Sequence, residues 1–236
     1  MRLRVVGCSP AWPNPGGAQS GYLLEEDGRR LLVDCGAGVL SRLRELEAWP
    51  RVDAIAISHL HLDHWGDLVP WAYGVRAGIA EGVPTPELWL PPGGTAALAA
   101  LGPVGGDAVV ETFAPRDYAE APFRAAGFEL TPVAMAHYTS RSFGLRIAGA
   151  AATIAYSADT GPTPDLAALA RDADVFLCEA TLAERENGRQ GHLTAEDARA
   201  AFRESGARRL LVVHRPVELP LPDGVERAHD GLELEL

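Results

Sequence analysis

A chain of 236 residues can fold as one large domain or two small ones, so its length alone does not choose between them. Hydrophobic residues make up 47% of the chain and charged residues 22%, which excludes a mostly disordered protein. The 32 acidic residues outnumber the 21 basic ones, all of them Arg. The resulting net charge of −11 disfavours a broad basic surface for nucleic acid, although a local Arg cluster could still bind it.

The N-terminal half predicts short strands joined by turns, together with three helices. Apolar runs predict strands at residues 3–6, 22–24, 31–33, 52–57 and 87–90. Glu26-Asp27-Gly28 is typical of a hairpin turn between the second and third of these strands. The spacing of apolar residues predicts helices at residues 39–46, 67–79 and 95–101.

The C-terminal half continues the alternation of strands and helices. It predicts strands at residues 128–135, 143–147, 153–156, 175–178 and 210–213, the second pairing with the third. Thr163-Pro164-Asp165 is typical of the start of a helix that continues to about residue 171. Residues 194–197 resemble a capping box that opens a helix to about residue 205. The pattern predicts α/β layers in one domain spanning residues 1–236.

Histidine is scarce, with seven in the chain, yet three lie within residues 59–64. His59, His61 and His64 stand beside Asp63, between a predicted strand and a predicted helix. Imidazole nitrogens and a carboxylate suit zinc, manganese or iron, and the absence of nearby thiols disfavours a structural zinc site. A solvated histidine-rich loop is the alternative. The close succession of strand and helix disfavours that loop, so we expect a metal site just past the strand ends.

The three cysteines, Cys8, Cys35 and Cys178, lie far apart and form no C-x-x-C pair. An odd number argues against a disulfide framework, so we expect buried small apolar residues in a reducing compartment. The N-terminus enters a strand without the apolar segment of a signal peptide. No apolar stretch is long enough to span a bilayer, and we expect a cytoplasmic protein.

The run at residues 59–64 resembles the H-x-H-x-D-H signature of the metallo-β-lactamase fold hydrolases. Three later segments resemble further motifs of that family, each after a strand: Ala136-His137-Tyr138, Ser157-Ala158-Asp159-Thr160 and Val213-His214-Arg215. The family resemblance implies a four-layer αββα sandwich with the metals at one edge.

Within that fold, the chain looks most like ribonuclease Z and its phosphodiesterase relatives. Residues 7–13, 20–24 and 33–36 resemble the N-terminus of that branch. Glu179-Ala180-Thr181 resembles its E-A-T motif, and Gly191-His192-Leu193-Thr194 resembles its G-H-S-T motif with Leu in place of Ser. Together these motifs extend the resemblance to nearly the whole chain.

The resemblance implies a set of ligands for two metals. One metal would be bound by His59, His61 and His137, the other by Asp63, His64 and His214, with Asp159 bridging both. Family members with oxygen chemistry at a di-iron site usually have Glu at the position of His61. Zinc is therefore the first expectation and manganese the second.

The same resemblance implies roles in catalysis. Two cations about 3.5–4 Å apart can hold a bridging hydroxide that attacks phosphorus in line. Asp63 would orient this hydroxide, His192 would be the general acid for the leaving alkoxide, and Glu179 would hold the tautomer of His192. The cap predicted at Thr194 supports this role, because a helix N-terminus can fix His192 near an anion. An exposed loop histidine and an ordinary surface carboxylate are the alternatives.

The expected substrate is inferred from a feature in which this chain differs from ribonuclease Z proteins. Members that bind tRNA usually carry a long Gly/Pro-rich or basic arm, but only 21 residues separate His137 from Asp159. The missing arm and the net negative charge favour a small or cyclic nucleotide phosphodiester. Arg141 and Arg215 are candidates for binding its phosphate, with ordinary surface charges as the alternative. By family resemblance we also expect a homodimer.

Three other functions stay open. The first is tRNA 3′-processing endoribonuclease activity with RNA as partner, which a basic patch opposite the metals would favour. The second is a lactonase or thioesterase, which the E-A-T and G-H-x-T elements disfavour because an acid for an alkoxide suits phosphoester cleavage better. The third is a non-catalytic binding module, which would normally have lost metal ligands.

Overall fold

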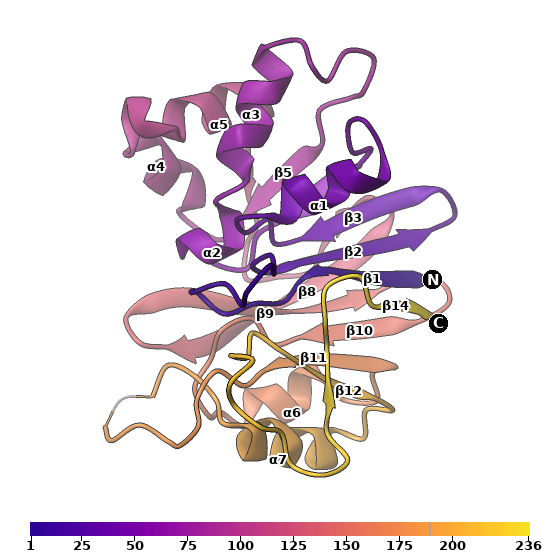
Figure 1. Cartoon of the computed structure of the whole chain (residues 1–236), viewed down its shortest axis with the longest axis vertical. Coiled ribbons are helices and arrows are strands. Elements are labelled where there is room, and N and C mark those ends of the chain that lie inside the picture. The colour runs from indigo at the N-terminus through magenta and orange to yellow at the C-terminus, as the bar shows by residue number, and fades with distance from the viewer. Residues whose placement is uncertain (189) are drawn as a thin grey trace.

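The computed structural model describes residues 1–188 and 190–236. It shows two mixed β-sheets packed face to face, with helices on both outer faces (Figure 1). Each sheet contains seven strands among the described residues. The αββα arrangement predicted from the sequence is therefore confirmed.

The first sheet combines the N-terminal half of the chain with one C-terminal strand. In spatial order its strands are β14 (Glu233–Glu235), β1 (Arg2–Gly7), β2 (Gly21–Glu26), β3 (Arg29–Val33), β4 (Ala54–Ala56), β5 (Glu87–Leu90) and β6 (Arg116–Asp117). Pairing is antiparallel from β14 to β3 and parallel from β3 to β6. Its outer face carries α1 (Val39–Leu46), α2 (Leu62–Trp65), α3 (Leu68–Arg76), α4 (Gly94–Ala99) and α5 (Gly106–Phe113).

The second sheet is built from the C-terminal half. In spatial order its strands are β13 (Glu226–Arg227), β12 (Leu210–Val213), β11 (Val175–Glu179), β10 (Thr153–Tyr156), β9 (Ser140–Ala148), β8 (Phe128–His137) and β7 (Phe123–Ala125). Pairing is parallel from β13 to β10 and antiparallel from β10 to β7. Its outer face carries α6 (Asp165–Leu169) and α7 (Ala195–Ser205).

The apolar runs arise because the strands are buried on both faces. Leu31 and Val33 of β3 pack between the two sheets, whereas Leu32 points to the helices on the outer face. In the second sheet, Leu177 of β11 faces the other sheet and Phe176 faces α6 and α7. Alternate side chains of a strand point to opposite faces, so one apolar run supplies two core layers. Each such side chain contributes about 1.5–3 kcal/mol when fully buried.

The expected elements are confirmed, with ends that shift by up to a few residues. The hairpin between β2 and β3, the pairing of β9 with β10 and the capping box at Thr194 are all present. The sequence did not predict α2, α5, the short 3₁₀ helix at Gly102–Val104 or the four short strands β6, β7, β13 and β14. The three cysteines are free and buried, as expected.

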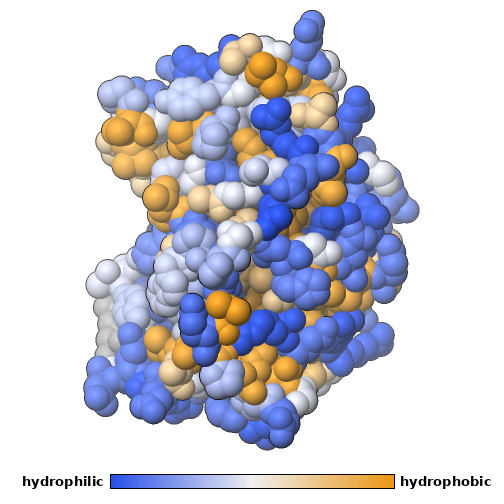
Figure 2. All heavy atoms as spheres, viewed as in Figure 1, coloured by the Kyte–Doolittle hydropathy of each residue, from blue (hydrophilic) through white to orange (hydrophobic). Residues whose placement is uncertain are grey.

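The surface is predominantly hydrophilic on the face shown in Figure 2, with apolar side chains exposed in small groups. In the described ranges 1–188 and 190–236, no helix has the length and apolar character required to cross a membrane.

The strands bring polar residues of distant sequence positions to one edge of the sandwich. These residues stand at or just after strand ends: Asp34 after β3, His59 after β4, His137 in β8, Asp159 after β10, Glu179 in β11 and His214 after β12. The carboxyl ends of parallel strands are where open α/β sheets place their sites.

Candidate metal centre

Residues 59–64 form a tight turn between β4 and α2. His59 follows β4, and its backbone pairs with that of Ser142 in β9. His61 is the extended N-cap residue of α2, while Asp63 and His64 lie within the helix. Because the backbone changes from extended to helical at His61, the side chains before and after it can enter the same site.

Gly36 allows this turn to pack against the loop after β3. A side chain at Gly36 would overlap the backbone carbonyl of Asp63. The backbone of Cys35 donates to His64 O at 2.7 Å and accepts from Asp67 N at 3.0 Å. These contacts hold α2 at His64 and the chain just after it at Asp67, and they therefore help to fix the directions of Asp63 and His64.

The structure brings the seven candidate ligands together in two clusters that share Asp159. The clusters are His59, His61, His137 and Asp159, and Asp63, His64, His214 and Asp159. Within each cluster the potential ligand atoms lie within 4.8 Å of one another. Asp159 Oδ2 is 3.8 Å from His59 Nε2, and its Oδ1 is 3.3 Å from His64 Nε2. The carboxylate of Asp159 thus lies between the clusters.

Each of the five imidazoles also has one ring nitrogen within hydrogen-bonding distance of an oxygen outside the clusters. The pairs are His59 Nδ1 with Ser58 Oγ at 3.1 Å, His61 Nε2 with Ser140 Oγ at 2.8 Å, His64 Nδ1 with Asp34 Oδ2 at 2.7 Å, His137 Nδ1 with Gly191 O at 2.6 Å and His214 Nδ1 with Thr181 Oγ1 at 2.9 Å. If each of these nitrogens is the donor, the other nitrogen directs a lone pair into the cluster, as a metal ligand must.

The inward atoms lack partners that could satisfy these lone pairs. His59 Nε2, His64 Nε2 and Asp159 Oδ1 are buried without a hydrogen bond to any described residue. His61 Nδ1 and His137 Nε2 face each other at 2.9 Å, where two lone pairs repel. Buried polar atoms without partners are costly, and a divalent cation with nitrogen and oxygen ligands would satisfy them. The residues present therefore fit metal ions.

Electrostatics favour the ligand forms of most of these groups. Burial lowers the pKa of His59, His61 and His137, which keeps the imidazoles neutral. Burial alone would raise the pKa of Asp159, but the imidazoles of His214 and His64 outweigh it and hold that pKa well below its usual value. The carboxylate consequently stays ionised.

Asp34 contacts the ring nitrogen of His64 that faces away from the ligand cluster. Its buried carboxylate accepts from His64 Nδ1 at 2.7 Å, Ser58 N at 2.7 Å, Ser58 Oγ at 2.9 Å and Tyr156 Oη at 2.7 Å. The backbone of Asp34 has a φ of 59°, in the left-handed region that non-glycine residues rarely adopt. Such strain concentrates at functional sites, where surrounding contacts fix it.

We expect Asp34→Asn to lower metal affinity by about 10–100-fold, because the amide cannot accept all four hydrogen bonds and His64 loses its orientation. Competition with a chromogenic chelator would measure this change. Asp53→Asn is a matched control, since Asp53 also accepts a backbone N–H, from Arg30, but at the opposite end of β4. Equal affinities in the two variants would show that Asp34 does not orient a ligand.

Glu179 and His192 lie together beside the clusters. The fully buried carboxylate of Glu179 accepts from Thr160 N, Thr181 N, Thr181 Oγ1, Leu193 N and His192 Nδ1, the last at 2.8 Å. Burial by itself would lower the pKa of His192, but the Glu179 carboxylate outweighs it and raises the pKa to about 9. His192 Nδ1 is 4.0 Å from Asp159 Oδ2, so a protonatable imidazole stands next to the clusters.

The two candidate phosphate-binding arginines are engaged elsewhere. The exposed Arg141 pairs with Glu120, and its neighbours on β9, Ser140 and Ser142, point to the clusters. Because side chains alternate along a strand, Arg141 points away from them. The buried Arg215 donates to the backbone carbonyls of residues 180, 182 and 220. The geometry therefore favours structural roles for both side chains.

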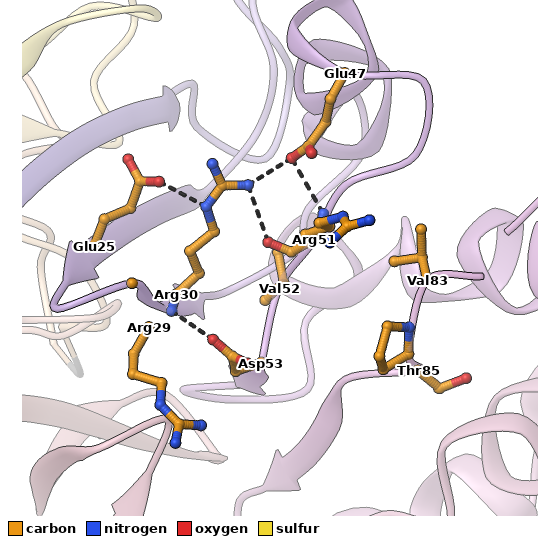
Figure 3. Close-up of a pocket in the computed structure, with 11 residues that line it drawn as sticks. Glu25, Arg29, Arg30, Glu47, Arg51, Val52, Asp53, Val83 and Thr85 are labelled. Atoms are coloured by element: carbon orange, nitrogen blue, oxygen red, sulfur yellow. Dashed lines mark hydrogen bonds and ion pairs between the residues drawn. The ribbon is translucent and has the colours of Figure 1, made fainter. Parts of the chain in front are cut away.

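A separate cavity of about 550 Å³ lies at the other end of the first sheet (Figure 3). Residues that precede β4 and β5, such as Val52 and Thr85, line it, and none of the candidate ligands does. Arg30 in its wall pairs with Glu25 and Glu47 and donates to the carbonyl of Arg51. The clusters of potential ligands thus lie elsewhere, at the carboxyl ends of the strands.

A family model described as the Beta-lactamase superfamily domain matches residues 29–215, a range that contains every candidate ligand. The chain belongs to this family. It is similar to the probable metallo-hydrolase YhfI of Bacillus subtilis, at 28% identity over 229 residues, covering 92% of this chain and 87% of YhfI. The crystal structure of YhfI matches with a TM-score of 0.83 and 26% identity, covering 99% of each chain.

Two further relatives cover most of the chain. The uncharacterized protein Rv1339 of Mycobacterium tuberculosis is 35% identical over 224 residues, covering 92% of this chain and 81% of its own. A ribonuclease Z of Salinibacter ruber is 28% identical over 295 residues, covering 96% and 89%. With the clusters above, family membership identifies a metal-dependent hydrolase of the metallo-β-lactamase fold.

The residues that support the imidazoles were not predicted from the sequence; among them are Asp34, Ser58, Ser140 and Thr181. Asp34 and Thr181 fall within segments that resemble family motifs, but the resemblance assigned no role to them. Ser58 and Ser140 carry no signal in the sequence, because serine is common after strands and in turns.

Proposed function

We propose that this protein hydrolyses phosphodiester bonds with two divalent cations, zinc first and manganese second, acting on a small or cyclic nucleotide phosphodiester. The observation that carries the proposal is the hydrogen bond of 2.8 Å between His192 Nδ1 and Glu179 Oε1 beside both ligand clusters. An alkoxide leaving group is a strong base that needs a proton, and a His–carboxylate pair can supply one. A thiolate leaves without such help, so the pair favours an ester of phosphate over a thioester.

Two side chains of the protein, Asp63 and His192, would have different roles in the reaction. When bound, the cations would polarise phosphoryl oxygens and lower the pKa of nearby water towards about 7. Asp63 Oδ2 lies 3.0 Å from His214 Nε2 within their shared cluster, where both atoms would bind a cation, and this leaves Asp63 Oδ1 to orient the attacking water and take its proton. Because Nδ1 of His192 is held by Glu179, Nε2 is the atom that would protonate the leaving oxygen.

Three observations support a small substrate. Residues between His137 and Asp159 form β9, β10 and their short connections, which leaves no room for an arm. The match to the ribonuclease Z of Salinibacter ruber extends over 295 residues although this chain has 236, so that relative carries additional segments within the matched range. The net charge of −11 also weakens long-range attraction of a polyanion.

A turnover panel on the metal-reconstituted protein tests the proposal. We expect hydrolysis of bis(4-nitrophenyl) phosphate and of a cyclic nucleotide, and no turnover of a lactone or an aryl thioester. Cleavage restricted to a precursor tRNA would favour the endoribonuclease function, and turnover of the lactone alone would reject phosphodiester chemistry. The Asp63→Ala variant should be inactive on every substrate of the panel, and retained activity would contradict the proposed metal site.

Two properties of the protein in the cell belong to the same proposal. We place it in the cytoplasm, because three free buried thiols suit a reducing compartment. We also expect a homodimer, by resemblance to the family.

A further inference from the structure

Tyr138 has an unusual position immediately after the candidate ligand His137. Its backbone φ is 43°, in the left-handed region that a bulky residue rarely adopts. Its ring lies 5.3 Å from the ring of His137 and 5.6 Å from that of His192, measured between centroids. The strained backbone therefore places an aromatic ring beside both the candidate metal ligand and the candidate acid, whose own rings are 4.9 Å apart.

Glu186 ties Tyr138 to the segment that carries His192. Tyr138 Oη donates to Glu186 Oε1 at 2.7 Å, and the backbone N–H of Gly191 donates to Glu186 Oε2 at 3.2 Å. The carbonyl of Gly191 lies 2.6 Å from His137 Nδ1. His137, Tyr138, Glu186 and Gly191 are thus linked in a closed ring by these hydrogen bonds and the peptide bond between His137 and Tyr138. The ring connects a candidate metal ligand, His137, to Gly191, the residue before His192.

Packing reinforces this connection. A side chain at Gly191 would overlap the ring of Tyr138, so the glycine lets the ring lie directly on the backbone before His192. Glu179 fixes the His192 ring on its other side through Nδ1.

Glu186 belongs to the loop between β11 and α7, which extends at the lower left of Figure 1. On either side of Glu186 this loop is held by Arg185, whose Nε donates to Asp197 at 2.9 Å, and by Gln190, whose side chain donates to the carbonyl of Glu186 at 3.1 Å. The carboxylate of Glu186 is therefore held where both Tyr138 and Gly191 can donate to it.

We propose that Tyr138 and Glu186 are positioning residues that form a latch, holding Gly191 and His192 so that the His192 imidazole faces the leaving group of the substrate. The inference deepens the proposed function and rests on it. Neither residue is assigned contact with substrate, because the hydroxyl and the carboxylate are directed to each other.

Amide hydrogen exchange of the metal-free protein tests the latch without any turnover. Tyr138→Phe removes only the hydroxyl, and Glu186→Gln replaces the acceptor of Gly191 N–H with an amide that offers one oxygen only. Each should accelerate exchange at Gly191 by about tenfold or more, because opening of the segment becomes easier. Unchanged exchange in both variants would overturn the latch even if the protein proved to cleave some other bond.

Turnover then tests the link to His192. We expect either variant to lower kcat by about tenfold on a cyclic nucleotide, whose alkoxide needs a proton, and by less than about twofold on bis(4-nitrophenyl) phosphate, whose phenolate does not. KM should stay unchanged. Equal losses on both substrates would show a general structural role and reject the positioning role.

Two control variants match these substitutions. Tyr73→Phe removes an exposed hydroxyl on α3, and Glu184→Gln neutralises an exposed carboxylate two residues from Glu186. Neither residue has a side-chain hydrogen bond in the part of the chain that the structure describes, so both controls should leave exchange at Gly191 unchanged. The double variant of Tyr138 and Glu186 should be no worse than either single variant, because all three break the same connection.

Discussion

Asp159→Asn is expected to reduce the number of tightly bound metal ions from the proposed two to at most one, and to lower turnover by roughly 10³-fold. Among the described residues, Asp159 alone is shared by the clusters around His59 and His64, and its two oxygens point to different clusters. An amide offers one oxygen, so one cluster must lose a ligand. A catalytic cation contributes several kcal/mol, and each 1.36 kcal/mol corresponds to a factor of ten in rate.

Elemental analysis after reconstitution and dialysis would measure the metal content, and the phosphodiester assay would measure the rate. The fold should survive, because Asn has nearly the same shape and Asp159 Oδ1 has no hydrogen bond to lose among the described residues. Asp107→Asn, an exposed carboxylate on α5, is the control and should keep full metal content. Two equivalents of metal in Asp159→Asn would contradict the bridging role.

The site could be predicted to this extent because its ligands follow strands. A buried strand is recognisable by its apolar run, and a polar residue directly after it must lie at the sheet edge. His137, Asp159 and His214 each obey that rule, and the cluster at residues 59–64 fixed which edge was meant. Family motifs that fall at strand ends thus placed side chains that lie far apart in the chain.

The elements that were missed depend on tertiary contacts. The strands β6 and β13 have two residues each, too few to show an alternation, and exist because a neighbouring strand offers hydrogen-bonding partners. Helix α5 begins without a side-chain cap, after a Gly/Pro-rich turn that is typical of a loop. Burial of Val109 and Phe113 in the apolar cluster on the outer side of the first sheet, next to α3 and α4, stabilises it instead.

The arginines show the limit of the strand-end rule. Sequence position put Arg141 and Arg215 next to the clusters, but it could not say on which side of the backbone each guanidinium lies. For Arg141 the pairing register of β9 with β8 decides this, with Arg141 opposite Ala136. For Arg215 three carbonyls of the folded backbone decide it. Neither kind of information is local in sequence.

His192→Ala is expected to lower kcat on a cyclic nucleotide by about 10²–10⁴-fold, the usual range for a general acid, while bis(4-nitrophenyl) phosphate turns over at nearly the wild-type rate. The reason is the leaving group: an alkoxide must be protonated as the bond breaks, and a nitrophenolate need not be. The elevated pKa of His192, about 9, favours the protonated form that can supply this proton.

The difference between the two substrates separates an acid from a structural residue. Loss of metal or of folding would slow both reactions equally, and the aryl substrate reports such loss directly. His229→Ala is the matched control, because His229 is an exposed imidazole that contacts only the backbone of Asp230 among the hydrogen bonds of the described residues. If His192→Ala slowed both substrates alike, the His192–Glu179 pair would no longer argue for an alkoxide leaving group, and the preference for a phosphodiester would lose its main support.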